Sequence, residues 1–477
     1  SLYDEYFGQA DNVKNIIDDN QVMKVAAIVA FFRGVDRANE MQMQYIQKYF
    51  GFQEEKFWEL VHILHKNELV DLYENEVVKI SDQILSTYLF YIPVFQKHLI
   101  SFSVILNDFY PSMRKNIMDV LNPILKSFDH KKVLDDIRPY IVKKLTQLKE
   151  GNQKHTLEFL DTFWFILPTE ALSFARSIIS QLPNNKTDWK HESFNKTNQY
   201  VSKTGIFELL VHFRFFGIEE FQISFGLLLN YLEKDKEVLP VIIKEFSETY
   251  NFKYSDYEYN YYVQDHIINT LIDKMDNGES YLFSMLFIAV SNEFLKFEYT
   301  DHISHQNSMT IRRFTLPAEP IIEALRSKII KHLSILMPNP TYQDAVITLF
   351  KDYILCMRDD EEGLGKTDFL AIKEYWFPVV NHQDIYQCLI VTDYLQYIGS
   401  LGIDYPSDWN EKFSNDEVDL FKTILNDRCD LRMLEMTEEE YQDHQHELLL
   451  GHFSNFTIKE FSNFLDKCVR LHQALSG

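Results

Sequence analysis

The chain has 477 residues, several times the ~100–200 residues of a typical domain, so more than one packed unit is expected. Only 14 glycines and 13 prolines interrupt it, which indicates few turns and long helices. With 47 basic and 71 acidic residues the formal charge is −24, which makes nucleic acid an unlikely partner because the phosphate backbone is also negative.

The apolar and cysteine patterns favour a cytoplasmic protein. No stretch approaches the roughly 20 uncharged apolar residues that a membrane helix needs, so no membrane partner is expected. The four cysteines are dozens of residues apart, which predicts neither a disulfide framework nor a cysteine metal site.

Three helices are predicted at the start of the chain. Apolar residues recur at helical spacing from Val22, and Gly34 is expected to end this helix. Asn39 is expected to cap a second helix that stops at Gly51. The third helix is expected to bury one stripe, formed by Phe57, Leu60, Val61 and Leu64.

A β-hairpin is predicted next, from Leu69–Tyr73 and Glu76–Ile80 around a turn at Glu74 and Asn75. Three helices followed by a hairpin predict a winged helix. DNA reading by this module is disfavoured, because the outward face of its third helix and its hairpin tip carry carboxylates. Packing or protein interaction is the favoured role.

At this point the sequence resembles a known family. The stretch from about Gln21 to Phe128 resembles the winged-helix domain of STAND-class P-loop NTPases as it occurs in large bacterial members. The segments that carry the resemblance are Phe57–Leu60, Val78–Tyr88, Leu85–Phe90 and Asn122–Leu125. In that family a Met-His-Asp-like triplet opens the next helix, and its His contacts the phosphate of the bound nucleotide.

The resemblance implies a role for Ser81 and Asp82, since Ile80-Ser81-Asp82 stands at the place of that triplet. Ser81 replaces the His of the family, so two interpretations remain open. Either residue senses the nucleotide state, or it only caps the following helix through its side-chain oxygen.

Beyond Phe128 the pattern predicts helix after helix. Asn415 and Thr457 are expected to cap two late helices, and residues 301–317 are expected to include a short strand or hairpin edge. The other predicted helices lie near 83–100, 112–126, 132–149, 154–167, 169–182, 206–216, 219–233, 235–249, 261–275, 279–297, 318–336, 342–357, 383–400 and 439–450.

The sequence therefore predicts an all-α protein, in which the N-terminal winged helix precedes a degenerate α-helical solenoid-like array. The expected parts are a lead-in helix or linker at 1–20, the winged helix at 21–82, a helical linker region at 83–183, a polar loop at 184–204 and the array at 205–477.

No catalytic or metal site is expected in this chain. Gly363–Thr367 resembles the end of a phosphate-binding P-loop, but the first glycine of that motif should fall at Asp360. The neighbouring carboxylates would repel a triphosphate, so a polar turn is expected instead. The histidine pairs His62 with His65 and His302 with His305 have helical spacing only, and we interpret each as part of a solvated helix face or as a histidine whose hydrogen bonds are satisfied locally.

The segment most typical of a binding surface is rich in tyrosine, a side chain favoured in recognition. We take its candidate protein-binding residues to be Tyr254, Tyr257, Tyr259, Tyr261 and Tyr262. The same tyrosines could equally serve ordinary packing between helices, and that alternative stays open.

The resemblance implies a function. We expect the non-catalytic sensor region of a STAND-like NTPase, which binds a protein ligand of phage origin and relays this to an upstream ATPase domain of the same polypeptide in antiphage defence. ATP and Mg²⁺ would belong to that upstream domain, and no cofactor is expected here. The alternative is a free-standing helical scaffold or adaptor whose winged helix docks other proteins.

Overall fold

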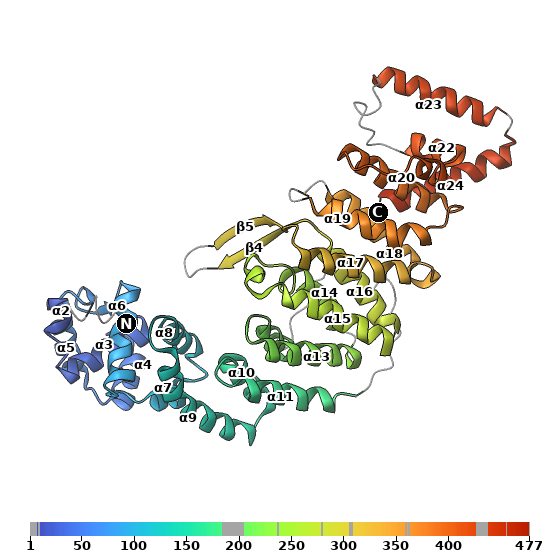
Figure 1. The fold of residues 1–477 in the computed structure, drawn as a ribbon. Helices are drawn as coiled ribbons and strands as arrows, with labels where there is room; N and C mark the ends of the chain where they lie inside the picture. The colour runs from blue at the N-terminus through green and yellow to red at the C-terminus, as the bar shows by residue number, and fades with distance from the viewer. Residues whose placement is uncertain are drawn as a thin grey trace. The chain divides into compact units, whose positions relative to one another are not determined.

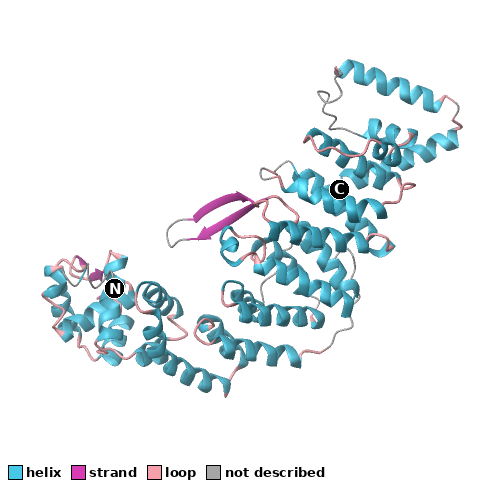
Figure 2. Ribbon diagram, in the orientation of Figure 1, coloured by secondary structure: helices cyan, strands magenta, loops and turns pink. Residues whose placement is uncertain are grey.

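This computed structural model gives the fold of most of the chain (Figure 1). It describes residues 7, 10–183, 205–235, 238–277, 280–304, 309–357, 360, 363–425, 437–454 and 456–476. The predicted polar loop at 184–204 therefore lies outside the described residues. Helices dominate the described part, and only two small sheets occur in it, so the predicted all-α class is confirmed (Figure 2).

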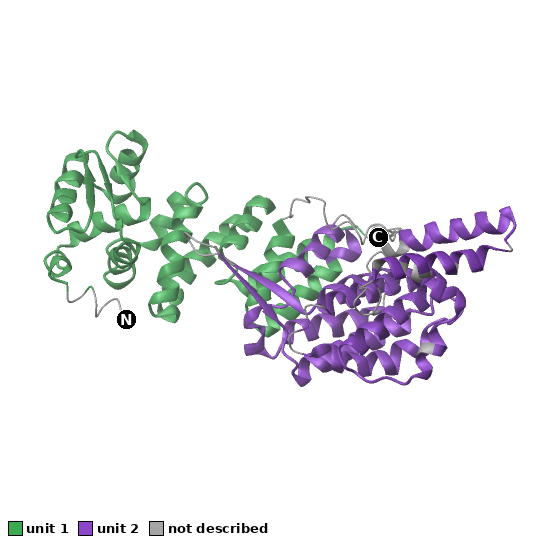
Figure 3. Ribbon diagram, turned by 90° about the horizontal axis from the view of Figure 1, so that it is seen from above, with its two compact units in different colours: residues 1–183, 203–230 green, residues 184–202, 231–477 purple. Residues whose placement is uncertain are grey.

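The chain divides into two compact units (Figure 3). Unit 1 comprises residues 1–183 and 203–230, and unit 2 comprises residues 184–202 and 231–477. Within the described residues no helix is long and apolar enough to cross a membrane.

Unit 1 consists of helices and one small three-stranded sheet. Its helices are α2 (Asp11–Lys14), α3 (Asn20–Phe32), α4 (Glu40–Tyr45), α5 (Glu54–Lys66), α6 (Gln83–Tyr91), α7 (Phe102–Phe109), α8 (Arg114–Ser127), α9 (His130–Lys149), α10 (Gln153–Phe163), α11 (Pro168–Gln181), α12 (Gly205–Val211) and most of α13 (Ile218–Lys234). Its strands are β1 (Val35–Asp36), β2 (Asp71–Tyr73) and β3 (Val77–Lys79), in the order β1-β3-β2.

The predicted end of the first helix is wrong by one residue. Arg33, with φ 63°, takes the left-handed conformation that was expected of Gly34. The chain has to turn this early because the next residues form β1, in which Val35 pairs with Val78. The short strand β1 was not predicted, since two residues give no periodic signal.

The other signals of this region are confirmed. Asn39 accepts the backbone N–H of Gln42, and the helix continues through a π-helical turn to Gly51, at φ 80°. The predicted stripe of α5 is buried. The hairpin forms, with Glu74 and Asn75 both left-handed. The elements therefore stand in the predicted order, and the winged-helix interpretation of them remains a prediction.

Unit 2 is an array in which alternate helices stack. α14 (Leu239–Glu248) contacts α16 (Ser280–Phe294), which contacts α18 (Pro340–Cys356); α18 contacts α20 (Ile385–Ser400), and α20 contacts α22 (Asp416–Leu425). The remaining helices are α15 (Tyr262–Asn277), α17 (Pro320–Leu336), α19 (Leu364–Ala371), α21 (Asp408–Phe413), α23 (Glu438–Phe453) and α24 (Ile458–Ser476), and the strands are β4 (Glu298–Ser304) and β5 (Met309–Thr315). In this series each helix therefore buries its apolar side against the preceding even-numbered helix.

Most predicted helices are present, and three helices were not predicted: α7, α19 and α21. α7 was missed because the predicted helix at 83–100 was too long: α6 continues as a π-helical turn and stops near Gln96. α19 was missed because its glycines suggested a turn. The caps at Asn415 and Thr457 are confirmed, since Asn415 accepts the backbone N–H groups of Glu417 and Val418, and Thr457 accepts that of Glu460.

One fully buried ion pair holds the middle of unit 2 together. The guanidinium of Arg326 on α17 donates to both carboxylate oxygens of Asp368 on α19, at 2.7–3.1 Å. Its remaining hydrogens bind the backbone carbonyls at the C-terminal end of α16, which are those of Phe294, Leu295 and Lys296. A buried arginine is tolerated because every donor has a partner.

Removal of this arginine should destabilise unit 2 strongly. In Arg326→Met, Asp368 would remain buried with only the Tyr353 hydroxyl as partner, which predicts a loss of about 3–5 kcal/mol. Lys328→Met on the same helix removes partly exposed contacts of the ammonium with Asp265 and Asn269 and should cost about 1 kcal/mol or less. Urea unfolding, monitored by hydrogen exchange of the amides in α16–α19, measures the loss of stability in both variants. Similar losses for the two variants would contradict the role given to the Arg326–Asp368 pair.

Candidate functional site

The predicted tyrosine run lies where a 3₁₀ helix, η6 (Tyr254–Tyr259), leads into α15. Three of the five tyrosines are on the surface: Tyr254, Tyr257 and Tyr259 have exposed fractions of 48%, 54% and 64%.

The other two predicted binding residues lie differently. Asn260 and Tyr261 are both left-handed, and this turn directs Tyr261 inward against Phe252. Burial, helped by nearby Glu319 and Asp256, raises the pKa of Tyr261 to about 12. Tyr262 is half-buried and its ring stacks on His266. Neither is well placed to contact a partner.

A buried polar anchor fixes the position of η6. The Asp256 carboxylate accepts the backbone N–H of Lys253 at 2.8 Å and the side-chain amide of Gln264 at 2.7 Å. Gln264 also donates to the carbonyls of Tyr250 and Asn251. Because both polar side chains are buried, the exposed tyrosines are carried on a rigid support.

The β4–β5 hairpin packs directly on this segment (Figure 1). The register pairs Tyr299 with Phe314 and Asp301 with Arg312, so all four side chains point to one face. Asp301 accepts the backbone N–H of Tyr254 at 2.7 Å and pairs with the Lys253 ammonium at 3.5 Å.

Tyr254 is the residue that joins η6 to the hairpin. Its ring contacts the edge of Phe314, with centroids 5.9 Å apart, and the Arg312 guanidinium lies 4.4 Å from its centroid. Ile311, with an exposed fraction of 56%, and Arg313 are also exposed, but they lie on the opposite face of β5 from Tyr254. We call the area formed with Arg312 the tyrosine–hairpin surface, consisting of Tyr254, Tyr257, Tyr259 and Arg312.

The hairpin half of this surface was not predicted as a binding site. A strand or hairpin edge was expected near 309–316 and is confirmed. Its contact with η6 could not be read from the sequence, because about fifty residues separate the two segments. The sequence signal for this hairpin was the alternation of Ile311 and Arg313 with Arg312 and Phe314, since alternate residues of a strand face opposite sides.

Ser81 and Asp82 occupy the start of α6. Asp82 accepts the backbone N–H groups of Ile84 and Leu85 at 2.7 and 2.9 Å, and is thus an N-cap. The Ser81 hydroxyl donates to the carboxylate of Asp71 on β2. Both residues are exposed. Their oxygens are therefore engaged within the module itself.

The P-loop-like segment is a helix start with an internal carboxylate. One Asp360 carboxylate accepts the backbone N–H groups of Gly363, Leu364 and Gly365, at 2.8–3.0 Å. These are the amides that a phosphate would need, and a negative side chain already occupies them. The Thr367 hydroxyl donates to the Leu364 carbonyl. This arrangement can cap α19 but offers no free amides for a phosphate.

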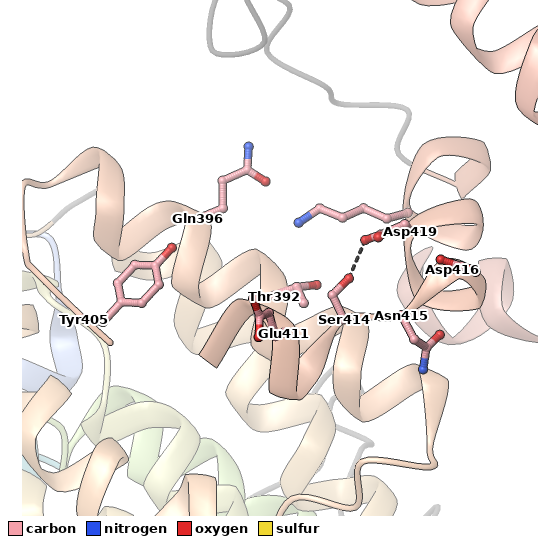
Figure 4. Close-up of a pocket in the computed structure, with 9 residues that line it drawn as sticks. Thr392, Gln396, Tyr405, Glu411, Ser414, Asn415, Asp416 and Asp419 are labelled. Atoms are coloured by element: carbon pink, nitrogen blue, oxygen red, sulfur yellow. Dashed lines mark hydrogen bonds between the residues drawn. The ribbon is translucent and has the colours of Figure 1, made fainter. Parts of the chain in front are cut away.

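A polar cavity of about 670 Å³ lies at α20–α22 (Figure 4). Glu411, Asp416 and Asp419 face it with a single cation, Lys422, and the Ser414 hydroxyl donates to Asp419. Lys422 also pairs with Asp393 at 3.4 Å. Burial raises the pKa of Asp393, although Lys422 opposes this. Within the described residues, no cluster of three or more His, Cys, Asp or Glu side chains could hold a metal ion.

A carboxylate–histidine cluster in unit 1 was not predicted. Asp161 on α10 binds Arg114 of α8 at 2.7 Å and the Nε2 of His212 at 3.0 Å, while Trp164 stacks on the His212 ring. Burial alone would raise the pKa of Asp161, but the hydrogen bonds from His212 and Arg114 outweigh it and leave the pKa below its ordinary value. The cluster joins three elements that are distant in sequence, so only the fold reveals it.

Comparisons of the chain with protein-family models, with curated proteins and with solved structures give no match. The assignment of a function therefore depends on the geometry described above and on the expectations from the sequence.

The Asp161 cluster should make the stability of unit 1 depend on pH. Because the pKa of Asp161 is lowered on folding, its contribution is complete above the unfolded pKa of about 3.9 and is lost as the pH falls through the folded value. The free energy of unfolding of the wild type should exceed that of Asp161→Asn by about 1–3 kcal/mol at pH 7, and this difference should shrink at pH 3. Urea midpoints across this range measure it. Glu150→Gln, which changes an exposed carboxylate, is the control; a pH-independent Asp161→Asn difference would refute the prediction.

Proposed function

We propose that this chain is the non-catalytic sensor region of a STAND-like NTPase and that it binds a protein ligand through the tyrosine–hairpin surface. The observation that carries the binding role is the composition of this surface. Three exposed tyrosines and Arg312 lie together on a support with a buried polar anchor, and Ile311 and Arg313 are exposed on the other face of the same hairpin. Tyrosine and arginine are the residue types that dominate binding energy at protein interfaces.

The N-terminal module supports the regulatory part of the proposal. Three helices and the sheet β1-β3-β2 are the elements of a winged helix, and the outward face of α5 carries Glu55 and Glu59, both exposed. A module of this charge favours packing on protein over docking to DNA. In this proposal it would pack on an upstream ATPase domain, which would hold ATP and Mg²⁺.

We propose that the ligand is a protein of phage origin, which the chain binds in the bacterial cytoplasm. This part of the proposal follows from the family resemblance alone. The second candidate is a free-standing helical scaffold or adaptor. It is favoured by the engaged oxygens of Ser81 and Asp82, which bind within the module and leave a nucleotide-sensing role without a specific supporting contact.

Nucleotide binding separates the two candidates. The natural full-length polypeptide should bind ATP if it includes the upstream domain, whereas this chain alone should not, because Asp360 occupies the only P-loop-like amides of the described residues. Isothermal calorimetry with Mg·ATP measures both, and Lys366→Ala should leave the result for this chain unchanged. A full-length polypeptide that does not bind ATP would leave the scaffold as the better proposal.

Loss of the exposed tyrosines should weaken ligand capture. Tyr257→Ser with Tyr259→Ser should reduce capture of the ligand about tenfold or more, because each ring offers a large exposed contact area. Ile335→Ser with Leu370→Ser removes similarly exposed apolar side chains elsewhere on unit 2 and should have no effect. The immobilised variants are incubated with extract of phage-infected bacteria, and captured proteins are quantified by mass spectrometry. Equal capture by both double variants would count against the binding surface.

A further inference from the structure

The hairpin offers backbone groups as well as side chains. β4 and β5 pair only with each other among the described residues, so the outer edge of β5 has no strand partner there. In an antiparallel sheet an edge strand presents alternate N–H and C=O groups outward, and these can bind an added strand. The hairpin therefore has the backbone requirement for strand addition.

The side chains of β5 would determine which peptide strand can add to its edge. Arg312 lies on the face that contacts Tyr254, whereas Ile311 and Arg313 lie on the opposite face, where they pair in register with His302 and Thr300. All three side chains are exposed. Within the described part of the chain, neither arginine forms an ion pair with a carboxylate.

The carboxylates nearest to these two arginines, those of Asp301 and Glu298, do not form ion pairs with them. Asp301, opposite Arg312, is buried and binds Lys253 and the backbone of Tyr254. Glu298 is opposite Thr315, one diagonal position from Arg313 on the open face, and does not come within ion-pair distance of it. In a chain with a formal charge of −24, the arginine pair on β5 is a local basic site that would attract carboxylates.

We infer that an extended acidic segment of the protein ligand adds as a strand to the free edge of β5. This inference rests on the proposed binding function and specifies its partner. Adjacent strand positions face opposite sides of a sheet, so the two arginines require two consecutive acidic residues, one for each face. Ile311 requires an apolar residue beside them. An antiparallel segment would read acidic-acidic-apolar from its N-terminus, and a parallel one would read apolar-acidic-acidic.

A random dodecamer peptide display library, selected on the intact chain, tests the sequence rule. The acidic pair followed or preceded by an apolar residue should be enriched about tenfold over its frequency in the library. The selected peptide should bind Arg312→Glu/Arg313→Glu about tenfold more weakly or worse. Arg313→Glu alone should also weaken binding, and it leaves the contact between Arg312 and Tyr254 intact. Lys351→Glu, which reverses a charge on α18 of the same unit, is the control.

Hydrogen exchange tests the strand addition. A bound peptide should protect β5 amides from exchange, which side-chain binding alone would not do. The inference is overturned if selected peptides lack the acidic pair, if both arginine variants bind as wild type does, or if β5 is not protected. A single-stranded oligonucleotide that binds with the same arginine dependence would also overturn it, because the site would then be a general polyanion site.

The outcomes also separate this inference from the proposed function. If the tyrosine variants lose ligand capture while the library shows no acidic preference, the binding surface stands and the strand-addition inference fails. If acidic peptides add to β5 while the tyrosine variants capture the ligand normally, the proposed use of the tyrosines fails and the β5 site remains.

Discussion

The buried pair of Arg326 and Asp368 is the constraint on which the middle of unit 2 depends. One guanidinium joins α17 to α19 and also binds the carbonyls of Phe294 and Leu295, where α16 ends and backbone carbonyls lack partners within the helix. Tyr353 of α18 donates to the same carboxylate, so four helices meet at one polar centre. Apolar stacking alone would allow these helices to slide, whereas directional hydrogen bonds in a buried site fix one arrangement.

That fixed arrangement is what allows the hairpin to present a surface. β4 follows the C-terminal end of α16, where Arg326 binds, and β5 leads into α17, which carries Arg326. Both ends of the hairpin are therefore held close to the buried ion pair. Tyr299 adds a contact from within the hairpin, since its hydroxyl donates to the carbonyls of Glu293 and Lys296. A two-stranded hairpin has little stability by itself, and this anchoring supplies the support it lacks.

The same principle, occupation of backbone groups by the protein's own side chains, decides the two sites that resemble nucleotide-binding motifs. Asp360 fills the amides at the start of α19, and Asp82 fills those at the start of α6. In both places the sequence suggests phosphate chemistry, but the local hydrogen bonds are those of ordinary helix caps. The surface best suited to binding is instead at η6 and β5, where tyrosines and arginines are exposed and not all of them have polar contacts within the described part of the protein.

The sequence by itself determined the helical class, most helix positions, the caps at Asn39, Asn415 and Thr457, and the hairpin at Glu74, because each depends on residues within one or two turns. It also marked the tyrosine run. Which tyrosines are exposed was decided only by the tertiary structure, since the left-handed turn at Asn260 directs Tyr261 inward. The tertiary structure likewise brought Arg312 to Tyr254, Arg326 to Asp368 and His212 to Asp161. Such contacts join residues more than forty positions apart, and no local pattern encodes them.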